Sequence, residues 1–373
     1  MSASLQGLAA QVPAAPKPLR PRLTPGKAAA VLLGLAFLIY LPFVLQDRAI
    51  LGLRLSNMQL LNVGLSQLNL TLIAAIGAVS LNYLTGSAGL VSIGHAAFFA
   101  VGAMAAAAAG KHLGLPFLAT LVAAVIAGAI AGVLAGLPSL RVRGLYFVLS
   151  TLALHFIVVY AFSEYQYAFY EVAGITMAEA KIGSFDLDSN IRWYFFLLPI
   201  VVVTCLALRN SLRYRQGRAL LAMRDNELAA AASGVDVRYL RLKAFAFSSA
   251  LAALAGALQA YYLTTVSAEI YTLNFAIQFI AMIIIGGMGS VAGGVAGALV
   301  WLLLPSILTG FAAQLNGSTD VFSRLLAANR PQVVNLIFGA LVVLLLIYAP
   351  GGLAGGARRV AVWVRRVLQR RAS

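Results

Sequence analysis

The chain has 373 residues, of which 61% are apolar and only 10% are charged. Soluble domains carry about 25% charged residues, so this composition excludes a water-soluble enzyme or binding domain. The formal net charge of +16 does not indicate nucleic-acid binding, because the basic residues lie between apolar runs and at the chain ends rather than on one folded face. We therefore predict an all-α integral membrane protein, since lipid offers no partner for open backbone groups.

Ten apolar runs are candidates for transmembrane helices, since about 20 apolar residues cross the hydrocarbon core of a bilayer. They cover residues 28–45, 58–83, 95–109, 117–137, 145–163, 193–209, 243–264, 274–288, 291–309 and 332–349. The first run is too long for the apolar part of a secretory signal peptide, so we expect it to stay in the protein as a span.

The loop charges predict the orientation of these spans. With a cytoplasmic N-terminus, 20 of the 27 Lys and Arg residues lie on the inner side, but only three of the 11 acidic residues do. Five of the acidic residues fall in a single outer loop, 164–192. Because positive charge marks the cytoplasmic side, this split favours an even number of spans with both termini cytoplasmic.

The two chain ends differ from the membrane domain between them. We expect residues 1–27 to form a basic cytoplasmic arm, and residues 28–355 to form the membrane domain with its long cytoplasmic loop 210–242. In residues 356–373, apolar residues at helical spacing alternate with arginines. This pattern predicts an amphipathic helix on the anionic inner leaflet, with a frayed basic tail as the alternative.

Two glycine-rich stretches interrupt the spans at corresponding positions, Gly86–Gly89 and Gly286–Ser290. By the span count, both follow a helix that runs inward. Paired breaks of this kind favour a translocation path near the bilayer midplane, and tight packing on small residues also explains them. The candidate path residues that flank the breaks, together with a polar residue of the second span, are Asn69, Ser87, Gly89, Ser92, His95, Gly287 and Gly289.

Polar stripes precede both breaks and indicate either a wet path or hydrogen bonds between helices. The stripe residues are Gln59, Asn62, Ser66 and Asn69 before the first break, and Asn274 and Gln278 before the second. The spans contain no acidic residue well inside, and their only internal ionisable candidates are His95 and His155, which argues against a proton-driven carrier. Regularly spaced glycines predict close helix packing at Gly128, Gly132, Gly136, Gly293 and Gly297.

The cytoplasmic loop 210–242 contains a predicted short helix. Residues 218–233 are strong helix formers, and Gly234 is a suitable C-terminal stop. Arg224 and Glu227 are spaced for an i, i+3 ion pair on that helix. Its alanine-rich surface fits a docking element for another protein, and a solvated linker is the alternative.

Three ordered motifs resemble the branched-chain amino acid permease family of ABC importers. The first is residues 81–103, LNYLTGSAGLVSIGHAAFFAVGA, and the second is the loop sequence GRAL at 217–220 with RDNELAA at 224–230 and SGV at 233–235. The third is IIGGMGSVAGGVAG at 284–297, followed by the ending PGGL at 350–353. The resemblance covers about residues 58 to 355 and is greatest to the second of two non-identical permease subunits.

The resemblance implies a set of partners in a bacterial cytoplasmic (inner) membrane. These are a sister permease subunit, two cytoplasmic ATPase subunits and an external or periplasmic solute-binding protein. The sequence has no G-x-x-x-x-G-K-[ST] phosphate loop, so we expect no cofactor on this chain and ATP use by the partner subunits. The resemblance places the contact with the ATPase at Gly217, Arg218, Arg224, Glu227, Ala230 and Gly234.

The sequence departs from the family pattern at two places. Glu227 precedes Gly234 by seven residues instead of six, with Leu228 inserted, and residues 170–176 lack the usual Thr-Gly-Gly of the outer loop. Branched-chain amino acids are the leading substrate class, and urea, short amides and aromatic acids stay open. An autonomous channel or secondary carrier is the second hypothesis for the function. A membrane-embedded enzyme is the weakest hypothesis, because the spans contain no carboxylate pair, metal cluster or nucleophile–histidine spacing.

The charge split makes a direct prediction about topology. A cysteine introduced by Asp188→Cys should react with a membrane-impermeant reagent added outside, and one introduced by Asn226→Cys should not, because loop 164–192 is external and loop 210–242 is cytoplasmic. Labelling of both variants in intact and opened cells measures this. External labelling at position 226 but not at 188 would reverse the orientation.

Overall fold

The computed structural model describes residues 40–43, 63–142, 144–170, 174–183, 185–314, 330–348, 351–356 and 359. The predicted arm 1–27, most of the first predicted span and the tail from residue 360 lie outside these residues. The chain divides into the units Met1–Val44 and Leu45–Ser373. Of the first unit, residues 40–43 are described, and they are helical; the second unit contains the fold described below.

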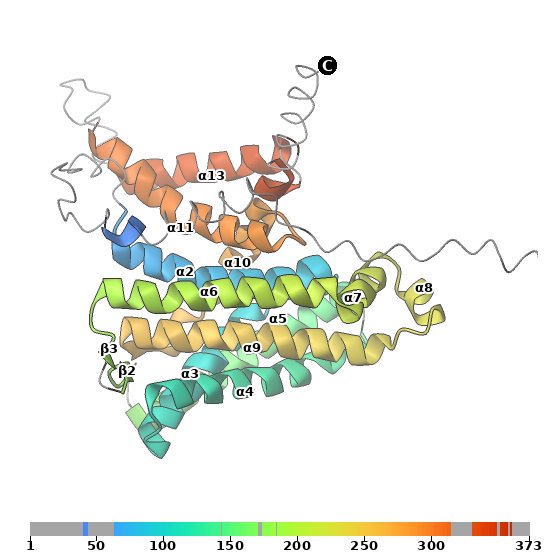
Figure 1. The fold of residues 1–373 in the computed structure, drawn as a ribbon, viewed down its shortest axis with the longest axis horizontal. Coiled ribbons are helices and arrows are strands. Elements are labelled where there is room, and N and C mark those ends of the chain that lie inside the picture. The colour runs from blue at the N-terminus through green and yellow to red at the C-terminus, as the bar shows by residue number, and fades with distance from the viewer. Residues whose placement is uncertain are drawn as a thin grey trace, which may run out of the picture. The chain divides into compact units, whose positions relative to one another are not determined.

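The second unit is a bundle of long helices that run side by side (Figure 1). They are α2 Leu65–Asn82, α3 His95–Leu113, α4 Phe117–Gly136, α5 Leu145–Tyr170, α6 Asn190–Arg213, α9 Val237–Leu263, α10 Leu273–Gly286, α11 Val291–Gln314 and α13 Arg330–Tyr348. Within the described residues, seven helices are long and apolar enough to cross a membrane, and α10 is apolar but shorter. The predicted all-α membrane fold is confirmed, whereas the count of ten spans and the side of the termini stay predictions.

Polar residues mark where several of these helices begin. Ser189, Asp236 and Thr272 precede α6, α9 and α10, and each side chain accepts a hydrogen bond from a backbone N–H of the first turn. Such capping satisfies N–H groups that have no partner inside the helix. A glycine ends helix α3: Gly114, at its C-terminus, adopts a left-handed backbone conformation and stops the helix.

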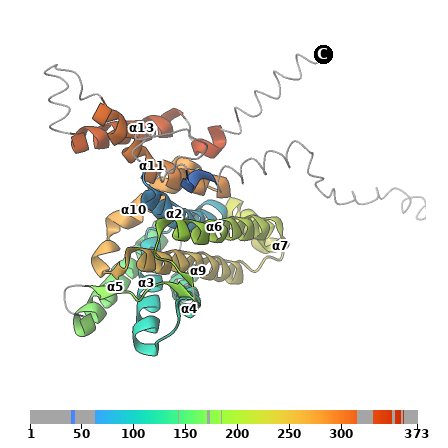
Figure 2. The same cartoon turned by 60° about the vertical axis from the view of Figure 1, so that its left-hand side comes forward.

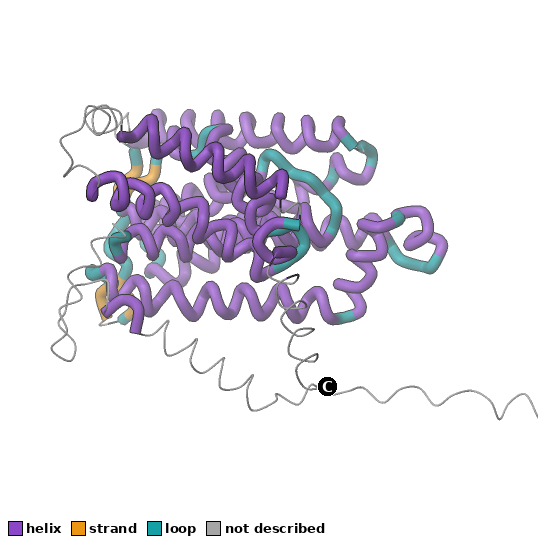
Figure 3. The backbone as a smooth tube through the Cα atoms, turned by 90° about the horizontal axis from the view of Figure 1, so that it is seen from above, coloured by secondary structure: helices purple, strands orange, loops and turns teal. Residues whose placement is uncertain are grey.

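The two ends of the bundle carry different short elements (Figures 1 and 3). At one end, which we call the strand end, antiparallel pairs join β1 (Ile175–Thr176) to β4 (Thr265–Val266) and β2 (Lys181–Ile182) to β3 (Phe185–Asp186). At the opposite end, which we call the loop end, lie α7 (Arg215–Asp225) and α8 (Glu227–Ala232). Three single turns are also described: η3 Tyr83–Ser87, η4 Pro138–Leu140 and η6 Ala268–Ile270. Residues 352–356 are helical as well.

Helix α9 lies at the centre of the bundle, in contact with α2, α3 and α4 (Figure 2). Glycines let the backbones approach closely, as predicted for α4. A Cβ atom added at Gly128 would lie 2.3 Å from the Ala253 Cβ, and one added at Gly132 would lie 1.7 Å from the Ser249 Oγ. The same arrangement joins α10 to α11, because a Cβ at Gly297 would lie 1.8 Å from the Met282 carbonyl oxygen. These close approaches confirm the packing role of the spaced glycines.

The crossing of α3 and α9 generates a stability prediction. A Cβ added at Gly102 would lie 2.0 Å from the Ala253 carbonyl oxygen, whereas the nearest atom to a Cβ at Gly110 of the same helix is 3.6 Å away. Gly102→Ala should therefore destabilise the protein by about 1–3 kcal/mol through overpacking. Gly110→Ala should be neutral or slightly stabilising, since alanine favours helix. Thermal unfolding of both variants in detergent measures this, and equal midpoints would show that α3 and α9 do not cross here.

Candidate functional site

The two glycine breaks contact each other at the loop end of the bundle. Helix α2 ends at Asn82 and continues into the π-helical turn η3, and α10 ends at Gly286. A Cβ added at Gly86 would lie 2.2 Å from the backbone nitrogen of Gly289. Gly289 itself has a φ of +79°, a conformation that favours glycine. Two segments far apart in the sequence thus meet backbone to backbone, and no larger residue fits at Gly86.

The buried side chain of Asn82 holds this junction together. Its Nδ2 donates to the carbonyl oxygens of Gly287, at 3.2 Å, and Ser290, at 2.8 Å. Its Oδ1 accepts from the backbone N–H of Gly289 at 2.6 Å. The bonds to the Gly287 carbonyl oxygen and the Gly289 N–H satisfy backbone groups at the break after α10. The Ser290 carbonyl oxygen also accepts from the Gly294 N–H in the first turn of α11. The sequence analysis missed Asn82, although an amide one turn before the first break in an apolar helix was an available signal.

Arg224 of α7 joins the cytoplasmic loop to the same junction. Its Nη1 donates to the Gly86 carbonyl oxygen at 2.8 Å, and its Nη2 lies 3.0 Å from the Asp225 carboxylate. A Cβ added at Gly89 would lie 2.7 Å from the Arg224 Cγ. One added at Gly289 would lie 3.5 Å from the Arg224 Nη1. Arg224 therefore reaches the place where both breaks meet, and the predicted Arg224–Glu227 ion pair is wrong.

The loop helix also differs from its prediction. Residues 218–233 do not form one helix, because α7 ends at Asp225 and α8 begins at Glu227, with Asn226 extended between them. The Asn226 side chain accepts from the Ala229 N–H, so it caps α8 instead of continuing α7. The predicted stop is confirmed: Gly234 has a φ of +82°, and the next N–H bonds back to the Ala230 carbonyl oxygen.

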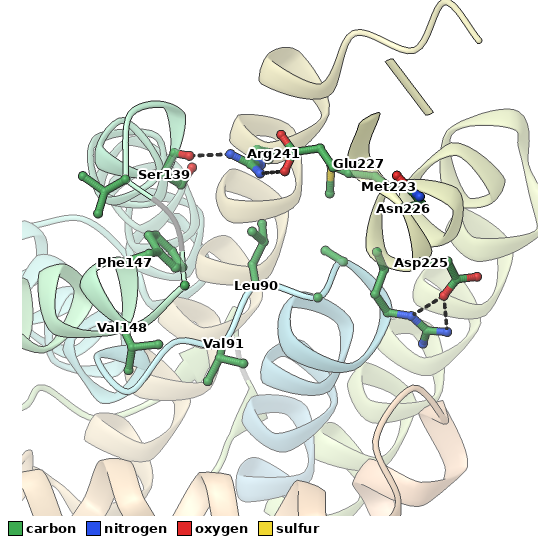
Figure 4. Close-up of a pocket in the computed structure, with 15 residues that line it drawn as sticks. Leu90, Val91, Ser139, Phe147, Val148, Met223, Asp225, Asn226, Glu227 and Arg241 are labelled. Carbon is green, nitrogen blue, oxygen red and sulfur yellow. Dashed lines mark hydrogen bonds and ion pairs between the residues drawn. The ribbon is translucent and has the colours of Figure 1, made fainter. Parts of the chain in front are cut away.

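Arg241 provides a second connection between the loop and the bundle (Figure 4). This buried guanidinium lies between the Glu227 carboxylate and the Ser139 carbonyl oxygen and donates a hydrogen bond to each. It thereby joins α8, α9 and the turn η4 that precedes α5. The sequence analysis did not single out Arg241, because a basic residue near a span edge fits the positive-inside pattern equally well.

A cavity of about 340 Å³ lies beside the contact between the loop and the first break. Its lining comes from the segment after η3, from η4, from the start of α5, from α7 and α8, and from Arg241. Leu90, Val91 and Phe147 form its apolar side, and Asp225, Asn226 and Glu227 lie on its polar side (Figure 4). Two arginines that line this cavity, Arg224 and Arg241, therefore hold the loop to the bundle.

The other predicted path residues lie near the first break but are enclosed. Ser87, Ser92 and His95 are buried, and the His95 Nε2 lies 2.9 Å from the Ser80 Oγ. Among the described residues, the Ser92 Oγ and the His95 Nδ1 have no hydrogen-bond partner. Gly287 has a φ of +109°. Both breaks lie at helix ends beside α7. The path near the bilayer midplane stays a prediction.

Asn69 does not join this group. It lies 13 residues before Asn82 on α2, which corresponds to about 20 Å along a helix. Its Nδ2 donates to the Asn190 carbonyl oxygen at 2.9 Å, so it ties α2 to the first residue of α6. Of the other residues in its predicted polar stripe, Ser66 is exposed, and residues 59 and 62 lie outside the described ranges. Asn69 thus makes a bond between helices at the strand end.

The strand end contains a wider cavity of about 510 Å³. Trp193, Tyr261 and Tyr262 line it together with the carboxylates of the β2–β3 segment. On its rim, Lys181 lies 2.6 Å from Glu179. The hydrogen bond to Glu179 and the charge of Asp186 raise the pKa of the Lys181 ammonium above its ordinary value. The cavity therefore combines aromatic walls with an ion-paired rim.

Comparison with known proteins decides the family. Residues 64–346 match the family described as "Branched-chain amino acid transport system / permease component". The chain belongs to this permease family. The permease is 30% identical over 308 residues to the high-affinity branched-chain amino acid transport system permease protein LivM of Escherichia coli K12, which covers 76% of this chain and 68% of the relative.

More distant relatives carry similar names. The permease is 29% identical over 164 residues to a probable branched-chain amino acid transport permease protein LivM of Methanocaldococcus jannaschii, covering 43% of this chain and 46% of that one. It is 26% identical over 211 residues to the LivH protein of the same organism, covering 56% and 63%. No solved structure matches the permease significantly.

The junction generates a prediction for Asn82. Asn82→Ala should lower stability by about 1–3 kcal/mol, because it leaves buried backbone groups of the second break without partners. Asn274→Ala, which removes an exposed amide from α10, is the matched control and should change little. Thermal unfolding in detergent compares the two variants. Equal stability would show that Asn82 does not hold the junction.

Proposed function

We propose that this chain is the membrane permease subunit of an ATP-binding-cassette importer for branched-chain amino acids. Its named relatives support the substrate class. The observation that carries the mechanism is the hydrogen bond from Arg224 to the Gly86 carbonyl oxygen, since it ties the cytoplasmic loop to both glycine breaks. In this proposal ATP is hydrolysed by separate subunits, and the chain itself is not an enzyme.

The loop is placed to transmit movement into the bundle. Helices α7 and α8 join α6 directly to α9, so a subunit that displaces the loop displaces both helices. Arg224 carries the displacement to the breaks after α2 and α10, and Arg241 carries it through Glu227 to the turn before α5. Elements that are packed together shift as units rather than deform continuously. The 340 Å³ cavity leaves room for such a shift.

The surface offered to an ATPase subunit is the outer side of α8. Leu228, the residue that interrupts the family motif, is 75% exposed and is flanked by exposed alanines at 229 and 231. Ala230, in contrast, is buried against the protein itself. Gly217, in the first turn of α7, is also buried, whereas Arg218 is exposed. We therefore assign Leu228 as the apolar anchor, and Ala230, Gly217 and Gly234 as residues that shape the loop.

The remaining partners follow if the docking surface on α8 faces the cytoplasm. The loop end faces the cytoplasm of a bacterial cell in the inner membrane, and the strand end faces the solute-binding protein. The exposed apolar faces of α4 and α5 contact lipid or the sister permease, as expected for residues such as Ile126, Ile130, Phe156 and Ile157. Ser87, Gly89, Ser92, His95, Gly287 and Gly289 border the path in this proposal, because the junction that they surround is the part that the ATPase moves.

Substitution of one exposed leucine at each end of the bundle tests whether α8 is the docking surface for the ATPase. Leu228→Gln should lower retention of the ATPase subunits about tenfold, because loss of a central apolar anchor costs more than 1 kcal/mol of binding free energy. Leu113→Gln, which changes a leucine that is 71% exposed at the strand end, should leave retention unchanged. Pull-down of the ATPase by each variant at equal expression measures this.

Two outcomes would count against the proposal. Equal ATPase retention by Leu228→Gln and the wild type would remove α8 as the docking surface. Accumulation of leucine in vesicles by the chain alone, without ATP or other subunits, would support an autonomous carrier instead. Uptake of urea or short amides in preference to leucine by the complete complex would reassign the substrate.

A further inference from the structure

A small cavity of about 110 Å³ lies between helices of the bundle, in the half nearer the strand end. Five helices supply its lining: α2, α3, α9, α10 and α11. Most of the lining is apolar, with Ile73, Met282 and Leu302 among its residues. Two amide side chains, Gln259 and Gln278, are its polar members. The predicted polar stripe of α10 thus contributes Gln278 to this cavity, while Asn274 of that stripe is exposed.

Three aromatic rings form one wall. The Phe99 ring lies 4.7 Å from the Phe279 ring and 5.5 Å from the Phe275 ring, and the last two are 5.1 Å apart. Glycines make room for the wall, because a Cβ at Gly77 would lie 2.2 Å from the Phe99 ring and one at Gly256 would lie 2.1 Å from the Phe99 carbonyl oxygen. Rings that interlock in this way, against closely packed neighbours, form a well-defined wall.

The polar side of the cavity has an unused acceptor. The Gln259 Oε1 is buried and has no hydrogen-bond partner among the described residues. A buried polar atom without a partner is costly, and in native proteins it commonly marks a missing water, ion or ligand. A carbonyl oxygen accepts hydrogen bonds and favours a cationic donor, such as the ammonium group of an amino acid.

The size of the cavity limits what its apolar part holds. Its volume of about 110 Å³ admits an aliphatic side chain such as an isopropyl or butyl group. A benzene ring is known to fill an engineered cavity of about 150 Å³, which is larger than this one. The shape therefore favours branched aliphatic side chains over aromatic ones.

We propose that this cavity is a transit site for branched-chain amino acids. The aliphatic side chain lies against Ile73, Met282 and the phenylalanine wall, and the Gln259 Oε1 accepts a hydrogen bond from the α-ammonium group. The inference rests on the proposed function and adds a place in the chain where aliphatic and aromatic substrates are distinguished. It assigns Gln259 and Ile73 as specificity-determining residues.

Two isoleucines on the same helix allow a matched test. Ile73 lines the cavity and Ile76 does not, and both are almost fully buried. In proteoliposomes with the complete transporter, Ile73→Ala should raise phenylalanine uptake relative to leucine about tenfold, because it enlarges the cavity. Ile76→Ala removes the same atoms elsewhere and should keep the wild-type ratio. Equal ratios in the two variants would overturn the transit site.

The acceptor is tested with two glutamines. Gln259 and Gln67 each have a buried Oε1 without a partner among the described residues, but Gln67 does not line the cavity. Gln259→Met should lower leucine uptake about tenfold, since the ammonium loses a charge-assisted hydrogen bond. Gln67→Met should leave uptake unchanged. Normal uptake by Gln259→Met would remove Gln259 from the site.

A photoreactive probe tests the site without any mutation. A diazirine-bearing leucine analogue, supplied to the wild-type complex, should crosslink to peptides that contain Ile73 or Met282, and excess leucine should suppress the crosslinks. Crosslinks confined to other segments would overturn the inference even if a variant failed to fold. If the wild-type complex takes up no branched-chain amino acid, the proposed function fails. If the wild-type complex takes up branched-chain amino acids but shows no crosslink in these peptides, only the transit site fails.

Discussion

The structure depends on the hydrogen bond between the Arg224 guanidinium and the Gly86 carbonyl oxygen. Carbonyl groups at a helix end lack partners within the helix, and the break after α2 exposes such a group to the loop. A cationic donor makes this bond stronger than a neutral one would. Because Gly86 also touches the backbone of Gly289, one side chain from the loop reaches the ends of two membrane helices.

Close packing of the helix bundle would allow this contact to transmit a displacement of the loop. Helix α9 packs on its neighbours through glycine, alanine and serine, so the backbones lie close and few side chains can rearrange. The buried Arg241 reinforces the same connection, since removing Glu227 would leave a desolvated guanidinium without its charged partner. In the proposed mechanism, displacement of α7 and α8 passes to α2, α9 and α10 as a shift of whole elements, and the cavity beside the loop is the space that changes.

Sequence reasoning was sufficient for features that depend on composition and local pattern. The apolar runs predicted the described helices, the spaced glycines predicted close packing, and Gly234 predicted the end of α8. It failed where a contact joins distant segments. Asn82 and Arg241 have no distinctive sequence pattern around them. Arg224 has a possible partner three residues away, Glu227, so its contact with the distant Gly86 was not predicted. Asn226 ended the predicted loop helix because its side chain caps α8 more favourably than it continues α7.

The number of substrate molecules imported per ATP hydrolysed tests the central contact most directly. The complete transporter carrying Arg224→Ala should still bind and hydrolyse ATP, but its import per ATP should fall about tenfold, because a charge-assisted hydrogen bond contributes about 1.5–3 kcal/mol. Arg215→Ala, an exposed arginine at the start of α7, serves as the control and should keep the wild-type ratio. An unchanged ratio in Arg224→Ala would contradict the account, since the loop would then drive the breaks without this bond.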